Sequence, residues 1–497
     1  MTSTFAMKQT LRALLVLHTF MLGCSGPGNL FTSTDPVGRL QTALDEVFAD
    51  SAFVATSPCI IVGSVTTGEV LYDRNSRLLI RPASNMKLVS SAAALHYLGT
   101  TFDFSTVVFA DSVTADGIVA GDLFIKGYGN PDLTTGDLDS LVRLLRDMNI
   151  SEIRGDVVVD ASYFDGEFWG KGWMWDDEPE PDEAFLTALS INDNCVKVII
   201  TAGLYGGDSV TVATDPPTSY VTVTSEAVTV EDTARVRLEV ERLYKERSNA
   251  ILVSGEVRAG RAPITRKVTV WKPELYAGTL FKERLELDSI RVNGSVRTGL
   301  VSERAVELAR HEWPLDSVLG NLNKTSDNLS AECALRTIAA ELTGDPGSAE
   351  AGISKVYEFL SSLGIDTTAI VMVDGSGVSH YNLLTTRMLY TLLQQMALRP
   401  DIFPAFYESL PIAGKDGTLE RRMRASSAEG TLRAKTGTIS AVSSLSGYVT
   451  TAGGELLAFS MSMQSFLGSS SRYKKLEDRI GSIIASFTRT VPVTVSP

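Results

Sequence analysis

Three short motifs occur in a fixed order along the chain, and their spacing constrains the fold more than any other feature of the sequence. Ser84-Asn85-Met86-Lys87 comes first, Ser326-Asp327-Asn328 second and Lys435-Thr436-Gly437 third. The stretch between the first two motifs is more than twice as long as the stretch between the last two. If all three motifs meet in one cleft, the long stretch must leave the domain that carries the cleft and return to it. The spacing therefore predicts a discontinuous domain with a large insertion.

The first motif contains the two groups of a serine nucleophile that is activated by a lysine. A serine hydroxyl is a poor nucleophile at neutral pH, so a base must take its proton. Residues three apart on a helix share a face, which brings Lys87 within reach of Ser84. The Ala/Leu-rich residues 88–98, with Gly99 at their end, predict that helix.

The ordered set of motifs is more informative than any one of them. A second Ser-x-x-Lys occurs at residues 471–474, in a charged stretch typical of a surface helix start, and a second Ser-x-Asn occurs at residues 190–192. Lys-Thr-Gly occurs once, and Thr438 and a strand-like segment at residues 443–450 follow it. Together the three motifs indicate an acyl-transfer site.

Composition and charge bound the class of protein. The chain has 497 residues, of which 44% are hydrophobic, so it can bury sizeable cores. Its net charge of -14 and the lack of a basic cluster argue against nucleic acid as a partner.

The few cysteines and histidines favour neither a disulfide framework nor a metal site. Cys59, Cys195 and Cys333 are far apart in the sequence and odd in number, a pattern typical of buried free thiols. No zinc site and no Ser/His/Asp triad can be assembled from the histidines that follow the N-terminal segment. We therefore expect no metal and no organic cofactor.

The N-terminus predicts an export signal. Lys8 and Arg12 precede an apolar stretch that is too short to span a bilayer. Met21-Leu22-Gly23-Cys24 resembles a bacterial lipobox, in which cleavage precedes a lipid-modified cysteine; plain secretion is the alternative. We expect a signal peptide at residues 1–23 and a tether at 24–36. The protein would lie in the periplasm or cell envelope and reach the membrane only through a lipid anchor on Cys24.

The remaining chain divides into two kinds of sequence. Residues 103–287 contain short Val/Thr/Ile runs broken by Gly, Asp and Pro, which predict a β-rich insertion. Residues 37–102 and 288–497 are expected to form one α/β (α+β) domain. Its central antiparallel sheet would combine an early hairpin with the last strands, and helices would cover both faces.

The flanks of the motifs resemble a known family, the low-molecular-mass class C (type-4) penicillin-binding proteins, which are D-alanyl-D-alanine carboxypeptidase/endopeptidases. The resemblance covers nearly the whole chain after the signal segment. The similar stretches are residues 323–329, 374–377, 413–419, 433–438, 445–448, 121–123 and 172–177. The resemblance implies a serine DD-peptidase/β-lactamase-like domain that is interrupted by two smaller, largely β domains.

The resemblance also implies the reaction. Peptidoglycan stem peptides would be hydrolysed through an acyl-enzyme on Ser84, and β-lactam antibiotics would act as inhibitors. Lys87, with its pKa lowered by burial and by the nearby Lys435 charge, takes the serine proton. Ser326 relays a proton to the leaving amine, and Asn328 holds Lys87 or the substrate amide.

The third motif is expected to hold the substrate. The resemblance implies that Lys435, Thr436 and Thr438, in the motif that contains Gly437, bind the terminal carboxylate. Backbone N–H groups of Ser84 and Thr438 would form the oxyanion hole, because the developing negative charge needs donors fixed in advance.

The chain matches the family pattern at Asp177 and departs from it at two nearby or related positions. The resemblance implies that Asp177 binds the free amino group of a diaminopimelate-type side chain. Asp177 follows the aromatics Trp173 and Trp175, which we expect to be exposed. Beyond it, residues 180–183 are acidic where the family usually has an aromatic residue, and His380 stands where it usually has an arginine. The simplest interpretation of residues 178–183 is a solvated loop.

Two other functions share parts of this pattern. A β-lactamase has the same three motifs, but the chain lacks a Glu-x-x-Leu-Asn element of the class A type. A non-catalytic cell-wall-binding lipoprotein is the second alternative. The motifs leave open the balance between carboxypeptidase and endopeptidase action, and they predict no oligomeric state.

Overall fold

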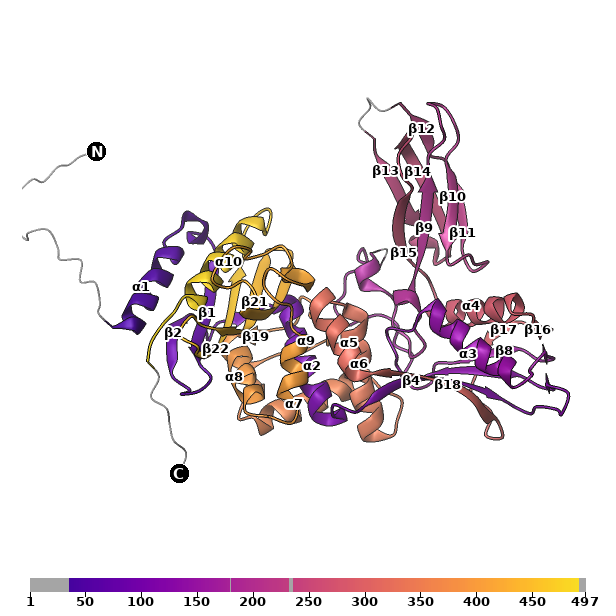
Figure 1. The fold of residues 1–497 in the computed structure, drawn as a ribbon, viewed down its shortest axis with the longest axis horizontal. Helices are drawn as coiled ribbons and strands as arrows, with labels where there is room; N and C mark the ends of the chain where they lie inside the picture. Colours follow the sequence, from indigo (N-terminus) through magenta and orange to yellow (C-terminus); the bar gives the residue numbers. More distant parts are fainter. Residues whose placement is uncertain (1–34, 179, 232–235, 491–497) are drawn as a thin grey trace, which may run out of the picture.

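A computed structural model describes residues 35–178, 180–231 and 236–490. The predicted signal peptide, Cys24 and most of the predicted tether lie outside these residues. The described chain forms a core domain, made of residues 35–102 and 315–490, and an insertion between them (Figure 1).

A five-stranded antiparallel sheet, in the order β2-β1-β22-β21-β20, forms the centre of the core domain. β1 comes from the start of the chain and pairs along its whole length with β22 from the end, from Ser57 opposite Gln464 to Ser64 opposite Leu457. The strands are β1 (Ser57–Ser64), β2 (Val70–Arg74), β20 (Leu432–Ile439), β21 (Val442–Thr450) and β22 (Leu456–Gln464).

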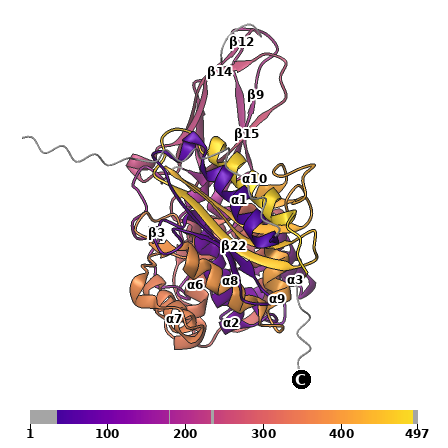
Figure 2. The same ribbon diagram turned by 90° about the vertical axis from the view of Figure 1, so that its left-hand side faces the viewer.

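Helices cover both faces of this sheet, as Figure 2 shows. One face carries α1 (Pro36–Phe48) and α10 (Ser471–Ala485), which form one hydrophobic core with the sheet. A second core lies on the other face and contains α2 (Met86–Leu98), α5 (Leu315–Gly320), α6 (Asn328–Thr343), α7 (Ala349–Ser362), α8 (Thr386–Ala397) and α9 (Phe403–Ser409). Because helices cover both faces of the sheet, its strands are buried on both sides, and such strands have near-continuous apolar sequences. The predicted sheet with helices on both faces is confirmed.

The nucleophile helix α2 is buried almost all round. Its residues from Met86 to Leu95 are all buried, which agrees with an Ala/Leu-rich segment that has no polar face. The helix ends at Gly99, whose φ of 79° is in a region that L-residues rarely adopt. A two-stranded sheet of β3 (Leu79–Ile80) and β19 (Leu384–Thr385) lies beside the entry to this helix.

The insertion has an inner and an outer lobe. The inner lobe contains the sheet β17-β8-β6-β4-β18, the small sheet β16-β7-β5 and two helices. Their bounds are β4 (Asp103–Ala110), β5 (Ile118–Val119), β6 (Leu123–Gly127), α3 (Thr135–Asp147), β7 (Glu152–Ile153), β8 (Val157–Asp160), α4 (Pro273–Leu287), β16 (Arg291–Val292), β17 (Val296–Thr298) and β18 (Val306–Pro314).

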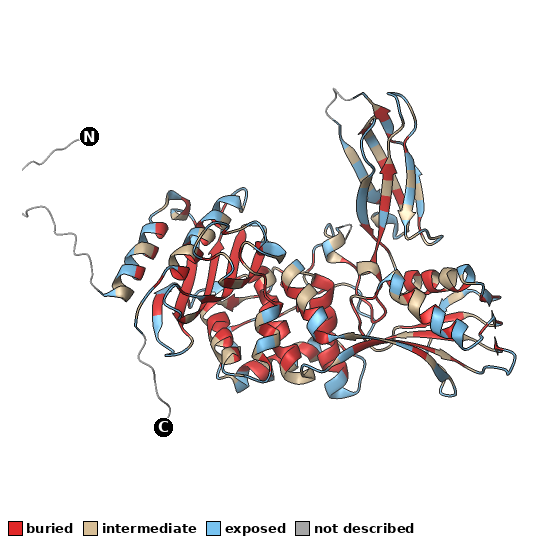
Figure 3. Cartoon of the chain, viewed as in Figure 1, coloured by how far each residue is buried: buried red, intermediate tan, exposed pale blue. Residues whose placement is uncertain are grey.

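The outer lobe projects away from the rest of the molecule (Figure 1). It holds the sheet β10-β9-β15 and a sheet in which β14 pairs with β11, β12 and β13. Two of its strands, β10 and β11, alternate between exposed and partly buried residues. In Figure 3 buried residues are sparser in this lobe than in the core domain. Its strands are β9 (Cys195–Thr201), β10 (Thr211–Asp215), β11 (Thr222–Ser225), β12 (Val228–Val230), β13 (Leu238–Arg242), β14 (Ala250–Arg258) and β15 (Ile264–Thr269).

The insertion ends later than the expected boundary at residue 287. β16, β17 and β18 follow that boundary, but they pair with β7, β8 and β4 of the inner lobe. The inner lobe also differs from a largely β domain, because α3 and α4 pack in its hydrophobic core. The sequence interpretation missed the continuity because these strands pair with partners far away in the chain, which local sequence patterns do not reveal.

An arm connects the two lobes and lies against the core domain. We define the arm as the described residues between β8 and β9. A small hydrophobic cluster joins Phe164, Trp173 and Leu186 of the arm to Leu329 and Cys333 of α6. This cluster brings the arm to the second motif.

The cysteines and the helices of the described residues can be compared with the expectations from composition. Cys59, Cys195 and Cys333 are free and buried, as predicted. Within the described ranges, none of the helices combines the length and apolar character that a bilayer crossing requires.

Candidate active site

The nucleophile lies where a tight turn runs into α2. Ser84 is in the 3₁₀ turn Ala83–Asn85, and Lys87 is in the first turn of the helix that follows. The Lys87 Nζ lies 3.2 Å from Ser84 Oγ. Ala83 has a φ of 50°, an uncommon conformation for a residue with a side chain and one that is often found at functional sites.

Lys87 is completely buried and contacts three oxygen atoms. Besides Ser84 Oγ, its Nζ donates to Asn328 Oδ1 at 2.5 Å and to the Ser376 carbonyl at 2.8 Å. Burial lowers the pKa of Lys87 to about 8, against the opposing effect of nearby carboxylates. A pKa near the working pH suits a group that must accept a proton and later return it.

Lys435 connects the third motif with the second. It lies on β20, and its buried Nζ donates to Ser326 Oγ at 2.8 Å and to the Thr436 carbonyl at 2.9 Å. Burial, together with the charge of Lys87, holds the pKa of Lys435 well below its usual range. Burial lowers the pKa of Lys87, and the repulsion between the Lys87 and Lys435 ammonium groups lowers the pKa of Lys435.

The second motif lies on a strained connection between a π-helical turn (Asn321–Thr325) and α6. Ser326 has a φ of 71° and is followed by Asp327, which caps α6 by accepting from the Ser330 N–H. This turn directs Ser326 toward Lys435 and Asn328 toward Lys87. The three motifs therefore meet through direct side-chain contacts.

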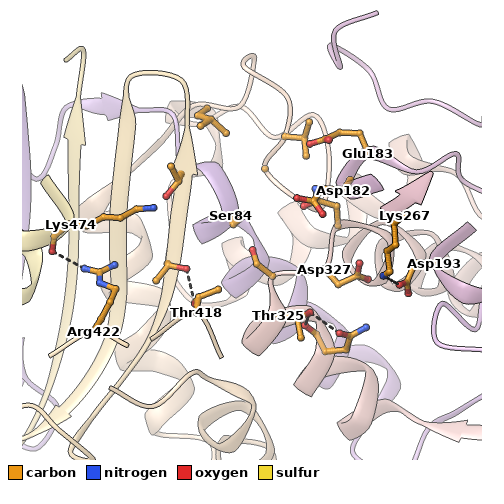
Figure 4. A pocket seen from close by; sticks show the side chains of 18 residues that line it. Ser84, Asp182, Glu183, Asp193, Lys267, Thr325, Asp327, Thr418, Arg422 and Lys474 are labelled. Atoms are coloured by element: carbon orange, nitrogen blue, oxygen red, sulfur yellow. Dashed lines mark hydrogen bonds and ion pairs between the residues drawn. The ribbon is translucent and has the colours of Figure 1, made fainter. Parts of the chain in front are cut away.

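A cavity of about 660 Å³ opens above these contacts. Figure 4 shows Ser84 between the arm, which carries Asp182 and Glu183, and the core-domain residues Thr418 and Lys474. The predicted residues that line the cavity are Ser84, Ser326, Asn328, Thr436 and Thr438. Lys87 and Lys435 are buried beneath it.

Two further core-domain residues belong to this region. Thr418 lines the cavity and accepts a hydrogen bond from Thr436 Oγ1 at 2.8 Å. Gly437 of β20 lies against the turn that carries Ser84. An added Cβ at this position would come within 2.9 Å of the Pro82 carbonyl oxygen, so the close approach requires glycine. Lys474, from the second Ser-x-x-Lys, lies near the start of α10 and also lines the cavity.

Asp177 is not among the residues that line the cavity with Ser84. Its Oδ2 accepts from the Met174 N–H at 2.9 Å, which closes the local turn. Its charge nevertheless acts on Glu183 and on His380, and it opposes the lowering of the His380 pKa by burial and by Arg81.

Glu183 is a cavity residue that the sequence interpretation missed. Its carboxyl is half-buried beside the catalytic groups, and desolvation, reinforced by neighbouring acids, raises its pKa to about 8. At the other end of the supposed solvated loop, Glu178 pairs with the fully buried Arg242 at 2.8 Å. The loop interpretation is therefore wrong at both ends. The burial of these two acidic residues depends on how the arm packs in the folded protein, which the sequence of the acidic segment does not reveal.

The two aromatics that precede Asp177 differ in exposure. Trp173 is 7% exposed, whereas Trp175 is 69% exposed and stacks on Tyr244. The expectation that both are exposed is correct only for Trp175. Trp173 is buried because it joins the hydrophobic cluster between arm and α6.

The described residues contain no group of three or more His, Cys, Asp or Glu side chains placed to hold a metal ion.

Comparison with known proteins gives a consistent result. The model of the D-Ala-D-Ala carboxypeptidase 3 (S13) family matches residues 40–485. A D-alanyl-D-alanine carboxypeptidase of Actinomadura sp. (strain R39) is 35% identical over 460 residues, which cover 90% of this chain and 84% of the relative. The D-alanyl-D-alanine carboxypeptidase DacB of Haemophilus influenzae is 28% identical over 402 residues, covering 80% and 83%.

Solved structures show the same fold. The crystal structure of penicillin binding protein 4 from Haemophilus influenzae superposes with a TM-score of 0.77 at 26% identity, over 90% of this chain and 99% of that one. A second structure of that protein, complexed with a β-lactam, has a TM-score of 0.71 at 24% identity and covers 92% and 100%.

Wild-type protein should lose thermal stability as the pH rises, because Glu183 becomes charged, and Glu183→Gln should remove this loss. The folded-state pKa of Glu183 is about 8, above the ordinary value of 4.5, so the folded state keeps a proton that the unfolded state releases between these values. The resulting stabilisation is complete below the unfolded pKa and is lost as the pH rises through about 8. Calorimetry from acidic to alkaline pH should therefore show the wild-type Tm falling relative to that of Glu183→Gln.

The exposed Glu180 provides the control for this measurement, since it lies in the same turn. Glu180→Gln should give a much smaller pH-dependent difference. A Tm difference between wild type and Glu183→Gln that stays constant with pH would contradict the desolvated state of Glu183.

Proposed function

The chain belongs to the D-Ala-D-Ala carboxypeptidase 3 (S13) family, and from this premise we propose that Ser84 is the nucleophile with which it hydrolyses peptidoglycan stem peptides. The protein is a serine D-alanyl-D-alanine carboxypeptidase. The observation that carries the residue assignment is the contact of the buried Lys87 ammonium with Ser84 Oγ. It supplies a base of lowered pKa where the serine needs one.

Acylation begins when Ser84 Oγ attacks the carbonyl carbon of the penultimate D-alanine. Lys87 in its neutral form takes the hydroxyl proton, and the carbonyl oxygen becomes an oxyanion. The backbone N–H groups of Ser84 and Thr438 are the proposed donors to that oxyanion. Both residues line the cavity.

Collapse of the oxyanion breaks the peptide bond and releases D-alanine. Ser326 gives its proton to the leaving amine, and Lys435, which contacts Ser326 Oγ, replaces that proton. The proton that Lys87 took from Ser84 then passes to Lys435, so both lysines return to their starting forms. Neutral Lys87 next takes a proton from the water that attacks the acyl-enzyme, and it gives this proton to Ser84 Oγ as the ester bond breaks.

The leaving D-alanine carries the terminal carboxylate, which the third motif is suited to bind. Lys435 offers positive charge, and Thr436 and Thr438 line the cavity above it. Thr418 supports this arrangement through its hydrogen bond with Thr436. A charge-assisted contact of this kind favours substrates with a free terminal carboxylate.

A β-lactamase remains the instructive alternative, because the cavity holds a carboxyl at Glu183 that could serve deacylation. The similarity to carboxypeptidases along 90% of the chain favours the peptidase. A fluorescent penicillin distinguishes the alternatives. A long-lived adduct indicates a DD-peptidase, a short-lived one a β-lactamase, and none a non-catalytic cell-wall-binding lipoprotein.

We also propose that the protein is exported and anchored through Cys24. The lipobox-like segment supports this, and α1 of the core domain begins at Pro36, the last residue of the expected tether. Mass spectrometry of the membrane-extracted protein should find lipid on Cys24 and no residue before it. An unmodified Cys24 would favour plain secretion.

Ser84→Ala should abolish peptidase activity and covalent labelling by fluorescent penicillin, since the attacking oxygen is removed. The Tm should change little, because the substitution enlarges no side chain. Gel fluorescence and release of D-alanine measure the two activities. Ser471→Ala, in the second Ser-x-x-Lys, is the matched control and should label like wild type. Labelling of the Ser84→Ala protein would place the nucleophile elsewhere.

Asp177→Asn tests the proposed contact with a diaminopimelate-type ammonium. Asp177 lies outside the cavity that Ser84 lines, but its charge acts on Glu183 within that cavity, so its removal should affect mainly substrates that carry the ammonium. We expect kcat/KM for diaminopimelate-containing muropeptides to fall much more than kcat/KM for short acyl-D-Ala-D-Ala peptides. The exposed Asp176→Asn is the control. Equal losses for both substrates would make Asp177 structural.

A further inference from the structure

The base Lys87 depends on two acceptors besides the nucleophile. These are Asn328 Oδ1 and the carbonyl of Ser376. Together they determine where the Lys87 Nζ lies, because a buried ammonium stays where its hydrogen bonds are made. The arm contacts Asn328 directly and contacts the loop of Ser376 through Asp374, while Glu332 of the core domain also accepts from the backbone N–H groups of Gly375 and Ser376.

The first contact with the arm fixes the orientation of the Asn328 amide. Its Nδ2 donates to the backbone carbonyl of Asp182 at 2.7 Å. A carbonyl can only accept, so the NH₂ end of the amide must face the arm. The oxygen end is then left to face Lys87. A flipped amide would direct its NH₂ group at an ammonium and would deprive that ammonium of one of its acceptors.

The second contact fixes the loop that carries Ser376. The Nε1 of Trp173 donates to Oδ2 of Asp374 at 3.0 Å, and both groups are buried. The same carboxylate accepts from the backbone N–H groups of Gly377 and Ser379. Asp374 thus ties the loop around Ser376 into a fixed shape, and the indole provides one of its donors from outside the core domain.

Trp173 is itself held rigidly in the interface. Its ring packs edge-on against Trp169 with centroids 5.2 Å apart, and it belongs to the cluster that contains Leu329 and Cys333 of α6. The backbone approaches the loop closely beside it, since a Cβ at Gly172 would lie 2.5 Å from Ser379 Oγ. The indole N–H therefore arrives at Asp374 with little freedom to move.

We propose that the arm completes the catalytic base, with Trp173 and the Asp182 carbonyl as positioning groups that fix the two acceptors of Lys87. The core domain carries all three motifs, but its lysine is correctly placed only when the arm is docked. The insertion then has a role in activating the nucleophile that is separate from any contact with substrate. The inference rests on the proposed role of Lys87 as base.

Trp173→Phe in the full chain tests this inference, since it keeps an aromatic ring and removes the N–H donor. The rate of acylation by benzylpenicillin should fall about 10- to 100-fold, as expected when a reacting group is misplaced. Benzylpenicillin carries no stem-peptide side chain, so lost substrate contacts with the insertion do not explain a slower reaction. Trp175→Phe, two residues along and exposed, is the matched control and should acylate like wild type.

The pH dependence separates positioning from simple packing. Acceptors favour the charged form of Lys87, so a loosened Ser376 carbonyl should lower its pKa and move the rising limb of the rate–pH profile to lower pH. Loss of packing alone would reduce the amount of active protein and leave that limb in place. An unshifted limb, with or without a slower rate, would overturn the inference.

A second replacement guards against misfolding of Trp173→Phe. Incorporation of 3-benzothienylalanine at position 173 keeps the shape of the indole and replaces its N–H with sulfur. It should reproduce both the slower acylation and the shifted limb. Wild-type behaviour of this protein would overturn the inference, while the proposed function would stand as long as Ser84 of the wild type is acylated.

Discussion

The active site depends on a lysine ammonium that is removed from water and given only neutral acceptors. Four carboxyl groups lie close enough to raise the pKa of Lys87: Glu183, whose own pKa of about 8 lets it keep its proton at neutral pH, and three others that are occupied elsewhere. Asp327 caps α6, Asp374 ties the neighbouring loop, and Glu332 pairs with Arg336 at 2.9 Å. A direct ion pair would stabilise the ammonium and raise its pKa, so the base would lose its neutral form at neutral pH. Keeping these acids occupied leaves desolvation as the dominant effect.

The sequence predicted those parts of the site that depend on local spacing. Ser84 and Lys87 are three residues apart at the start of one helix, and Lys435 lies on a strand whose pattern is plain, so local rules are enough to place them. The sheet with helices on both faces followed for the same reason. Trp173 and Glu183 could not be placed, because their burial depends on how the arm docks against α6. An acidic run and a Trp-x-Trp pair have the same sequence pattern whether they lie in solvent or in an interface.

The insertion joins the core domain at one place. Its first strand β4 and its last strand β18 pair antiparallel, so that Asp103 lies opposite Pro314 where the chain leaves and returns. A single pair of strands would allow the lobes to swing, but the arm provides a second attachment near α6. Two attachments restrain such motion more than one does. The insertion can therefore keep a defined position against the core domain without a rigid linker.

The pairing of β1 with β22 has a consequence for the order in which the protein can assemble. β1 leaves the ribosome long before its partner β22, which begins only at Leu456. Until then β1 has only the short β2 beside it, and one apolar edge lacks its native neighbour. Contacts of such sequence separation form slowly, and exposed strand edges favour aggregation. The insertion, which is complete in sequence by residue 314, can fold while the core domain still waits for its C-terminal strands. Enzymatic activity would therefore appear only after β22 has been synthesised, and a chaperone that shields β1 would have its longest task before that point.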